Sequence, residues 1–182
     1  MNLGAVGTGA ITKSMLAEFK RCKDFNCMAV CSRKEETGRA MADQFGIPTV
    51  YTSLEDMLAD PAIDMVYIAS PNAIHYGQAK AALLAGKHVI CDKPLCTSVT
   101  ELDEIERLVA ENGLQLCCML DLRYMAQVQK AKEMIESGTL GEIYTASFTG
   151  QHALNFENRP KWYFEDGKQG GTINDIAIHG ID

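Results

Sequence analysis

Leu3-Gly4-Ala5-Val6-Gly7-Thr8-Gly9-Ala10-Ile11-Thr12 is the stretch that decides the fold, because it runs from an apolar strand through a glycine turn into a helix. The first glycine of such a turn permits the tight bend, and the second lets a pyrophosphate approach the backbone N–H groups at the helix start. Thr12 stands where the usual fingerprint has its third glycine. At the first strand–helix junction of a βαβ series this pattern predicts a dinucleotide-binding turn, with a plain tight turn as the alternative.

Apolar runs and helical patterns alternate along the following part of the chain. The runs occupy residues 27–31, 65–69, 88–91 and 114–120, and helix-length segments separate them. Strands that are apolar throughout are typical of a parallel sheet covered by helices on both faces. The sequence therefore predicts an α/β fold that begins with a doubly wound Rossmann sheet.

The pattern changes in the last third of the chain. An amphipathic helical pattern ends at Gly138, and residues 144–149 then alternate apolar and polar side chains, which is typical of an antiparallel strand. We place a domain boundary near Asp121. Residues 1–121 are predicted to form an NAD(P)-binding Rossmann domain, and residues 122–182 the beginning of an α/β substrate and oligomerisation domain with a mainly antiparallel open sheet.

Composition excludes several classes of protein. The 182 residues carry a formal net charge of −7 without a dense Lys/Arg cluster, which argues against nucleic-acid binding. No apolar run approaches the length of a membrane span, and the N-terminus lacks the basic start of a signal peptide. Seven cysteines without a C-x-x-C pair argue against a zinc site and predict buried free thiols. We expect a cytoplasmic protein that binds no metal, nucleic acid or membrane.

The end of the second predicted strand bears on the cofactor. This position normally carries an acid that binds the adenosine ribose, and here the strand ends in Cys31-Ser32-Arg33. A hydroxyl and a guanidinium suit a 2′-phosphate, which an acid would repel. The pattern favours NADP(H) over NAD(H). The alternative is that Arg33 stacks on adenine and that both cofactors bind.

Three further stretches carry a family resemblance. Ser70-Pro71-Asn72 follows one predicted strand, with His75 three residues on, and Asp92-Lys93-Pro94 follows the next strand. Gly170-Gly171-Thr172-Ile173-Asn174-Asp175-Ile176-Ala177-Ile178-His179 lies near the end of the sequence. With the glycine turn, these motifs resemble the glucose-fructose oxidoreductase / inositol dehydrogenase / MocA (Gfo/Idh/MocA) family, in the same order and over essentially the whole chain.

The resemblance implies an NAD(P)-dependent oxidoreductase that transfers a hydride between a nicotinamide cofactor and a sugar, polyol or related hydroxyl or keto compound. It implies a catalytic group made of Lys93, Asp175 and His179. It also implies a homo-oligomer for the full-length protein. The expected cofactor-binding residues are Gly7, Thr8, Gly9, Ala10, Ile11, Ser32, Arg33, Ser70, Asn72, Asp92 and Lys93.

The residue types agree with this chemistry. Lys93 follows a strand, at the sheet edge where ligands bind in doubly wound folds, and can donate to a developing alkoxide. Asp175 and His179 are four residues apart, on one face of a helix. His179 can accept the hydroxyl proton, and Asp175 can orient it. The alternative is a helix pair without catalytic meaning.

Two departures from the family pattern qualify the prediction. Asp92 stands where the family motif has glutamate, and its shorter side chain predicts a lost or water-bridged contact. Family members continue well beyond the position that corresponds to Asp182. A cofactor-binding sensor or regulator, or an inactive fragment that lacks a complete substrate pocket, is therefore the alternative function.

Other conspicuous side chains receive structural predictions. His75 is expected to begin a helix without a catalytic role. Tyr76 and Lys80 have the spacing of the tyrosine–lysine pair of short-chain dehydrogenases, but we expect them on an exposed helix face. Trp162 with Arg159 nearby either lines a polar substrate pocket or packs within a loop.

Overall fold

The computed structural model describes the chain except for residues 151–156, 158, 166–167 and 169. Six strands form one parallel sheet in the order β3-β2-β1-β4-β5-β6. This is the order of a doubly wound Rossmann sheet, in which the winding direction reverses between β1 and β4. The α/β prediction is confirmed. The strands are β1 (Asn2–Val6), β2 (Asn26–Cys31), β3 (Thr49–Tyr51), β4 (Met65–Ile68), β5 (His88–Asp92) and β6 (Leu116–Met119).

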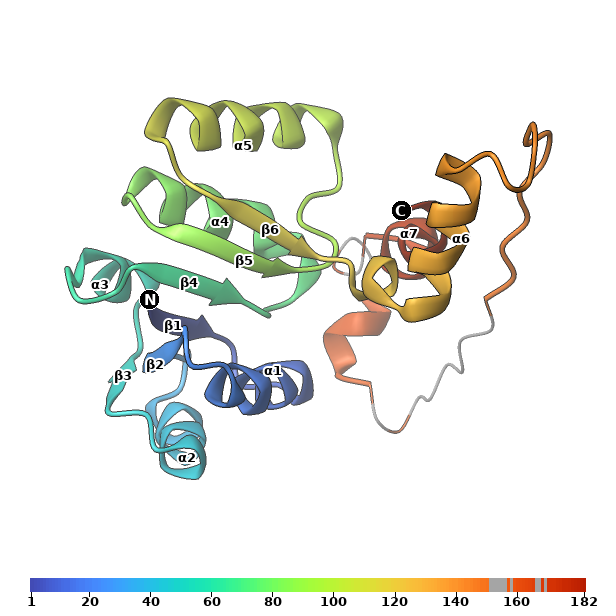
Figure 1. The fold of residues 1–182 in the computed structure, drawn as a ribbon. Helices are drawn as coiled ribbons and strands as arrows, with labels where there is room; N and C mark the ends of the chain where they lie inside the picture. Colours follow the sequence, from blue (N-terminus) through green and yellow to red (C-terminus); the bar gives the residue numbers. More distant parts are fainter. Residues whose placement is uncertain (151–156, 158, 166–167, 169) are drawn as a thin grey trace.

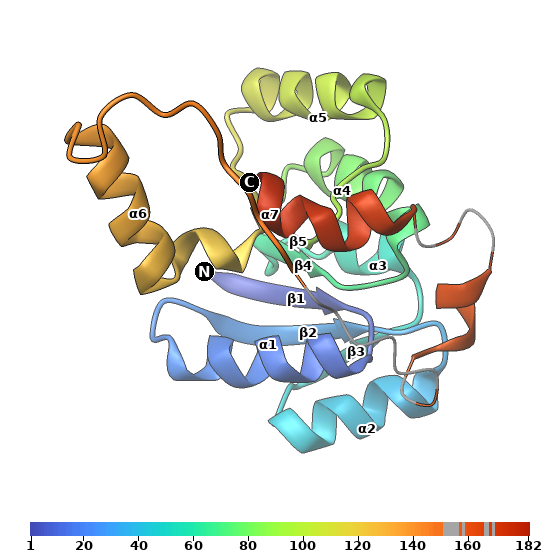
Figure 2. The same cartoon turned by 90° about the vertical axis from the view of Figure 1, so that its right-hand side faces the viewer.

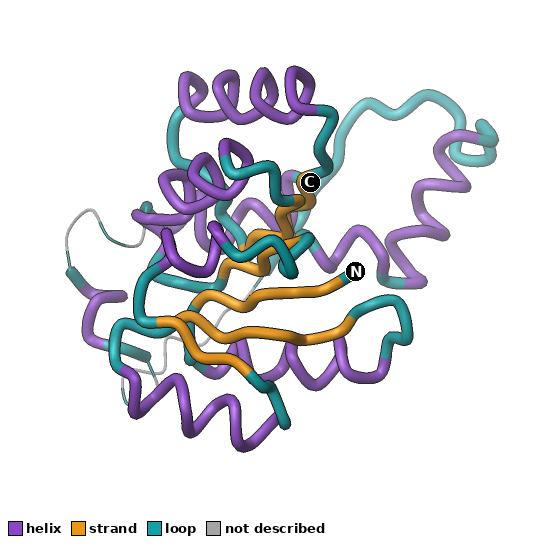
Figure 3. Tube along the Cα trace, turned by 90° about the vertical axis from the view of Figure 1, so that its left-hand side faces the viewer, coloured by secondary structure: helices purple, strands orange, loops and turns teal. Residues whose placement is uncertain are grey.

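Helices cover both faces of the sheet, as Figures 1 and 3 show. Residues of α1 and α2 pack into the core on one face, and residues of α3, α4 and α5 pack into the core on the other. Among the described residues, α6 and α7 follow the last strand. The helices are α1 (Ala10–Arg21), α2 (Glu35–Phe45), α3 (Leu54–Ala59), α4 (His75–Leu84), α5 (Val99–Asn112), α6 (Ala126–Glu136) and α7 (Ile178–Ile181).

The central strand β4 explains why the predicted strands are apolar throughout. Met65 and Tyr67 pack in the core with α1 and α2, whereas Val66 and Ile68 pack in the core with α3, α4 and α5. All four side chains are buried. A strand covered on both faces leaves no position for a polar side chain, so the two-residue alternation of a half-exposed strand is absent.

The carboxyl ends of the strands meet at one edge of the sheet, and the C-terminal segment crosses this edge. Figure 2 shows α7 and the π-helical turn Ile173–Ala177, which continue one another, running across the ends of the central strands. The loops after β1, β2, β4 and β5 open on the same edge. The fold therefore brings the glycine turn and the last motif of the sequence to one side of the molecule.

The chain after β6 differs from its prediction in one respect. The helical pattern before Gly138 is confirmed by α6, which stands clear of the sheet in Figure 1. The antiparallel strand predicted at residues 144–149 is absent: these residues are described and form no strand. A strand needs a neighbour that shares its backbone hydrogen bonds, and no other described segment pairs with this one, so Tyr144 and Phe148 remain exposed. None of the helices in the described ranges has the length and apolar character of a membrane span.

Candidate cofactor and catalytic site

The glycine turn lies between β1 and α1, where the winding direction reverses. Gly7 has a φ of +106°, and a Cβ atom there would lie 2.5 Å from the carbonyl oxygen of Ala69, so the position requires glycine. The Gly7 N–H donates to the carbonyl oxygen of Cys31 at 3.0 Å, which ties the turn to β2. Gly9 caps the N-terminus of α1, and a Cβ atom there would meet nothing within 4 Å. The approach to the unpaired N–H groups of the first helical turn is therefore open, as an anion site requires.

The neighbours of Gly9 share this open edge. Ala10 and Ile11 are exposed and Thr8 is half-buried. Thr12, in contrast, is fully buried, and its Oγ1 has no hydrogen-bond partner among the described residues. This oxygen would lie 3.3 Å from a Cβ atom at Gly7, so it points at the turn. An unsatisfied buried hydroxyl costs about 1–3 kcal/mol, which makes Thr12 an unusual choice for a purely structural position.

The residues that follow β2 include the exposed cation Arg33. Ser32 is buried, and its Oγ lies 2.7 Å from the Oγ1 of Thr37. Because the Thr37 hydroxyl donates to the carbonyl oxygen of Lys34 at 2.9 Å, the Ser32 proton is directed to Thr37 and is not available to a phosphate. Arg33 is exposed and forms no ion pair within the described part of the chain. Of the two residues predicted to favour a 2′-phosphate, only Arg33 has N–H groups that can donate to it.

The loops after β4 and β5 are joined through His75. The Ser70 hydroxyl donates to Oε1 of Gln78 at 2.6 Å, and Asn72 is buried at the start of the short turn that follows. His75 is buried as well, with Nδ1 at 2.8 Å from the carbonyl oxygen of Pro94 and Nε2 at 2.7 Å from that of Ser70. These two contacts confirm that His75 serves the structure of the site.

Lys93 and Asp175 meet although 82 residues separate them in the sequence. Lys93 Nζ lies 2.9 Å from Asp175 Oδ1 and also donates to the Asp175 backbone carbonyl. The Tyr163 hydroxyl donates to the other carboxylate oxygen, Oδ2. Asp175 is buried, whereas the Lys93 side chain is 20% exposed. Asp175 belongs to the π-helical turn, a rare conformation that occurs frequently at functional sites.

His179 does not pair with Asp175, and the prediction that Asp175 orients it is wrong in this structure. The carboxylate oxygens of Asp175 instead accept hydrogen bonds from Lys93 and Tyr163, and a charge-assisted bond from an ammonium is among the strongest that a buried carboxylate can accept. His179 Nδ1 instead lies 3.6 Å from Oδ1 of Asp121, beyond hydrogen-bond length. Nδ1 is buried without a hydrogen-bond partner among the residues that the structure describes.

Asp92 lies between these groups at the end of β5. Its Oδ1 accepts the N–H of Lys93 at 2.9 Å, so the shorter acid of this chain turns back on its own loop. Burial raises the pKa of Asp92 above its usual range, and the bond from Lys93 together with the charges of His75, Lys93 and His179 offsets part of this shift. The carboxyl is therefore under the electrostatic influence of three basic groups of the site, His75, Lys93 and His179.

Tyr163 is the residue that the sequence did not reveal. Its ring lies 4.3 Å from the guanidinium carbon of Arg159, so the aromatic partner of Arg159 is Tyr163, and the neighbouring Trp162 is only half-buried. No spacing rule connects position 163 to the motif that contains Asp175. The three consecutive aromatic residues 162–164 indicated that this segment could contribute an aromatic ring to the site, but not which of the three.

Tyr76 and Lys80 lie in a helix contact and not on a free surface. The Tyr76 hydroxyl donates to Glu104 of α5, and Lys80 Nζ lies 2.7 Å from Oε1 of the same carboxylate. The bond to Glu104 raises the pKa of Tyr76, the opposite of what a catalytic tyrosine base requires. The expectation of an exposed helix face is corrected, and the short-chain dehydrogenase comparison finds no support.

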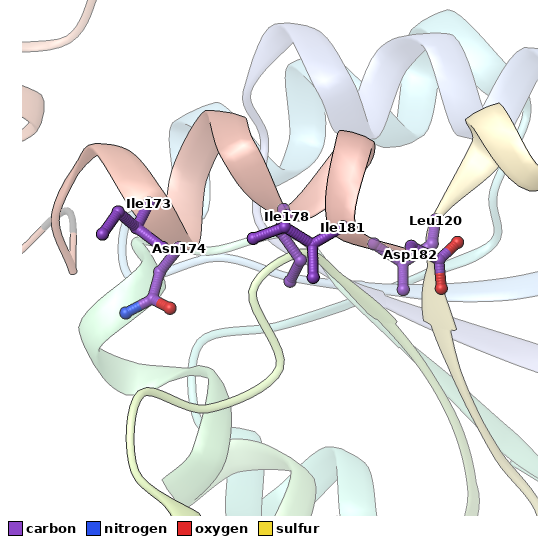
Figure 4. Close-up of a pocket in the computed structure, with 6 residues that line it drawn as sticks. All are labelled: Leu120, Ile173, Asn174, Ile178, Ile181 and Asp182. Carbon is purple, nitrogen blue, oxygen red and sulfur yellow. The ribbon is translucent and has the colours of Figure 1, made fainter. Parts of the chain in front are cut away.

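An apolar cavity of about 280 Å³ lies beside the C-terminal helix (Figure 4). Ile173 and Ile181 at its rim are 69% and 73% exposed. The carboxylate of Asp182 accepts a hydrogen bond from Arg123 Nε at 2.8 Å. The lining residues are Leu120, Ile173, Asn174, Ile178, Ile181 and Asp182.

The cysteines are free, as predicted, but not uniformly buried. Cys31 and Cys91 are buried, whereas Cys117 on the edge strand β6 is exposed. Burial raises the pKa of the Cys31 thiol to about 11, which leaves it unreactive. In the part of the chain that the structure describes, no three acid, histidine or cysteine side chains gather as a metal site would require.

Comparison with known proteins identifies the family. A family model described as "Oxidoreductase family, NAD-binding Rossmann fold" matches residues 1–120, and the "GFO/IDH/MocA C-terminal domain" model matches residues 128–182. The chain belongs to the Gfo/Idh/MocA family. The resemblance carried by the four sequence motifs is thereby confirmed.

The curated relatives of this Gfo/Idh/MocA chain include sugar and inositol dehydrogenases. D-xylose 1-dehydrogenase (NADP(+)) 2 of Haloferax volcanii is 29% identical over 181 residues, which cover 100% of this chain and 55% of the relative. The scyllo-inositol 2-dehydrogenase (NADP(+)) IolU of Bacillus subtilis is 31% identical over 180 residues, covering 97% and 55%. The chain spans about half the length of the curated relatives it matches.

Solved structures agree on the fold. GenD2 from gentamicin A biosynthesis, in complex with NAD, has a TM-score of 0.85 at 22% identity and covers 100% of this chain and 51% of its own. The scyllo-inositol dehydrogenase from Lactobacillus casei with bound NAD(H) and scyllo-inositol has a TM-score of 0.73 at 24% identity, covering 78% and 42%. The 3-ketoreductase KijD10 from Actinomadura kijaniata, solved as a Y186F mutant with TDP-benzene and NADP, has a TM-score of 0.72 at 26% identity, covering 79% and 44%.

Proposed function

We propose that this chain is the cofactor-binding part of an NAD(P)-dependent dehydrogenase that acts on the hydroxyl or keto carbon of a sugar, a polyol or a related compound. The observation that carries the proposal is the Lys93–Asp175 pair, at 2.9 Å, at the sheet edge onto which the glycine turn opens. The dehydrogenase relatives support the same reaction class, whereas nothing in the comparisons favours a sensor. The boundary near Asp121, the cytoplasmic location and the homo-oligomer stay predictions.

The glycine turn fits a dinucleotide. A pyrophosphate needs close access to backbone N–H groups, and the open approach at Gly9 provides it. Gly7 supplies the conformation that the tight turn requires. Thr12 places a buried, unsatisfied hydroxyl directly behind the turn. Ser70, Asn72 and the neighbouring loop after β5 would border the nicotinamide end, because they follow the strands on the far side of the reversal point.

A bound nicotinamide supplies the hydride acceptor or donor, and the protein supplies the proton chemistry. An ammonium has three N–H donors, and two of those of Lys93 are directed to Asp175. The third is left for a substrate oxygen, where it would stabilise a developing alkoxide. Asp175 therefore acts as the group that aims Lys93, and His179, with its free Nδ1, is proposed to hold the hydroxyl proton.

The test of this assignment is a Lys93→Met variant of the full chain. We expect unchanged affinity for the cofactor and at least a hundredfold loss of cofactor reduction with polyols, about the effect of one transition-state donor. Lys80→Met is the matched control, because it removes a lysine–carboxylate pair of similar length outside the site. Full turnover in Lys93→Met would refute the role of Lys93. Failure of the unmodified chain to bind any nicotinamide cofactor would refute the proposed function itself.

For the cofactor we propose NADP(H) over NAD(H), on the evidence of Arg33, which is exposed and forms no ion pair with any residue that the structure describes. An Arg33→Ala variant should lose affinity for NADP(H) by about tenfold or more, the value of one charge-assisted contact to phosphate, and keep its affinity for NAD(H). Titration calorimetry with both cofactors measures this difference. Equal losses for the two cofactors would mean that Arg33 stacks on adenine. A Ser32→Ala variant should change neither affinity, since the Ser32 proton is directed to Thr37.

A further inference from the structure

His75 occupies the start of α4, between the two loops that carry the Ser70 and Lys93 motifs. It is 1% exposed. Its Nδ1 lies 2.8 Å from the carbonyl oxygen of Pro94, and its Nε2 lies 2.7 Å from the carbonyl oxygen of Ser70. Both separations are hydrogen-bond lengths. One buried ring therefore joins the loop after β4 to the loop after β5.

The two partners of His75 decide its protonation. Both are carbonyl oxygens, which accept hydrogen bonds and never donate them. A neutral imidazole has one N–H and one bare nitrogen, so it would leave a ring lone pair facing a carbonyl lone pair at 2.7 or 2.8 Å. Only the doubly protonated ring satisfies both contacts.

A buried cation needs a compensating charge, and the carboxyl of Asp92 is the acidic group on which His75 acts electrostatically. The charge of His75 is among the influences that lower the pKa of Asp92 against the effect of burial. The other basic groups that act on Asp92 are Lys93 and His179. Lys93 directs its ammonium to Asp175, and the nearest carboxylate to His179 Nδ1 is that of Asp121, at 3.6 Å.

We propose that His75 is a buried imidazolium that holds the Lys93 loop against the Ser70 loop and supplies a positive charge beside Asp92. It is a positioning residue: its bond to Pro94 fixes the residue that follows Lys93, and hence the direction from which Lys93 reaches Asp175. The inference concerns the protein without substrate or cofactor, so it stands or falls independently of the proposed reaction.

Nitrogen-15 NMR of the full chain with labelled histidine tests the protonation, at about pH 7.5, where a free histidine is mostly neutral. His88 is an internal reference, because its Nδ1 accepts the N–H of Gln115 at 3.0 Å and must be bare. We expect two protonated ring nitrogens for His75 and one for His88. His75→Gln assigns the signal. If that variant does not fold, replacing the other three of the four histidines assigns it by elimination. A bare ring nitrogen in His75 overturns the proposal.

The titration of Asp92, followed by carbon-13 NMR of its carboxyl, tests the charge. Glutamine at position 75 keeps a polar side chain but removes the positive charge. In His75→Gln we therefore expect the pKa of Asp92 to rise above its value in the unmodified chain, whereas His88→Gln should leave it unchanged. If the pKa of Asp92 is the same in the unmodified chain, His75→Gln and His88→Gln, His75 carries no charge and only connects the two loops.

Discussion

Alanine at the two glycines of the turn should separate the fold from the binding site. Gly7 has a φ of +106°, and an added Cβ would lie 2.5 Å from the backbone oxygen of Ala69. Gly9 has a φ of −78° and a ψ of −179°, which any residue adopts, and an added Cβ would meet nothing within 4 Å. Gly7→Ala should therefore destabilise the protein, whereas Gly9→Ala should spare the fold and obstruct the cofactor.

The magnitudes follow from these two environments. At Gly7 the left-handed backbone costs about 1–2 kcal/mol for a residue with a Cβ, and the clash with a backbone oxygen adds about 1–3 kcal/mol, as other overpacked sites do. The sum, about 2–5 kcal/mol, is a large part of the stability of an ordinary domain. At Gly9 the weaker helix cap and the stiffer unfolded chain oppose each other, so stability should change by less than about 1 kcal/mol. Overpacking against a pyrophosphate would weaken binding by about tenfold to a hundredfold.

Urea unfolding and cofactor titration measure the two effects on the same preparations. Gly7→Ala should lower the urea midpoint by roughly 1–2 M, given slopes of about 1–3 kcal/mol per molar for proteins of this size. Gly9→Ala should unfold at nearly the original midpoint and bind cofactor poorly. Equal destabilisation by both variants would refute the reasoning, and so would tight cofactor binding by Gly9→Ala.

Two further predictions concern buried polar groups near the same edge. Thr12→Val removes the hydroxyl that has no partner among the described residues and keeps the shape of the side chain. Urea unfolding of the cofactor-free protein should therefore show a free energy of unfolding that is higher by about 1 kcal/mol. A lower free energy of unfolding would mean that Thr12 Oγ1 has a hydrogen-bond partner. Because burial raises the pKa of Asp92, its contribution to stability is fully present below its ordinary pKa and is lost as the pH rises through the raised value. The side chain of Asn in Asp92→Asn does not titrate, so the unfolding midpoint of this variant should decline less with rising pH than that of the unmodified protein. Parallel curves of midpoint against pH for the two proteins would contradict the raised pKa of Asp92.

The Rossmann sheet was predictable because its physical signals are local. Each buried strand is a short apolar run, and each break between elements carries a residue with a definite conformational reason, such as Gly46 and Gly113, whose positive φ ends α2 and α5. The strand predicted at 144–149 lacked this kind of support. Alternation states which face of a strand would be buried, but the strand itself depends on a neighbour whose backbone shares its hydrogen bonds. No described segment provides one, so the pattern alone was not sufficient.

The site was predictable only as far as its groups could be placed on the sheet edge. Lys93 follows β5 at the end where ligands bind, so its location could be inferred from topology. Its partner could not, because helical spacing relates Asp175 to His179 and says nothing about donors from elsewhere in the chain. The fold brings Lys93 and Tyr163 to the Asp175 carboxylate, and His179 lies toward Asp121. A motif therefore identifies the residues that reach a site, whereas their roles depend on which donors and acceptors the fold brings there together.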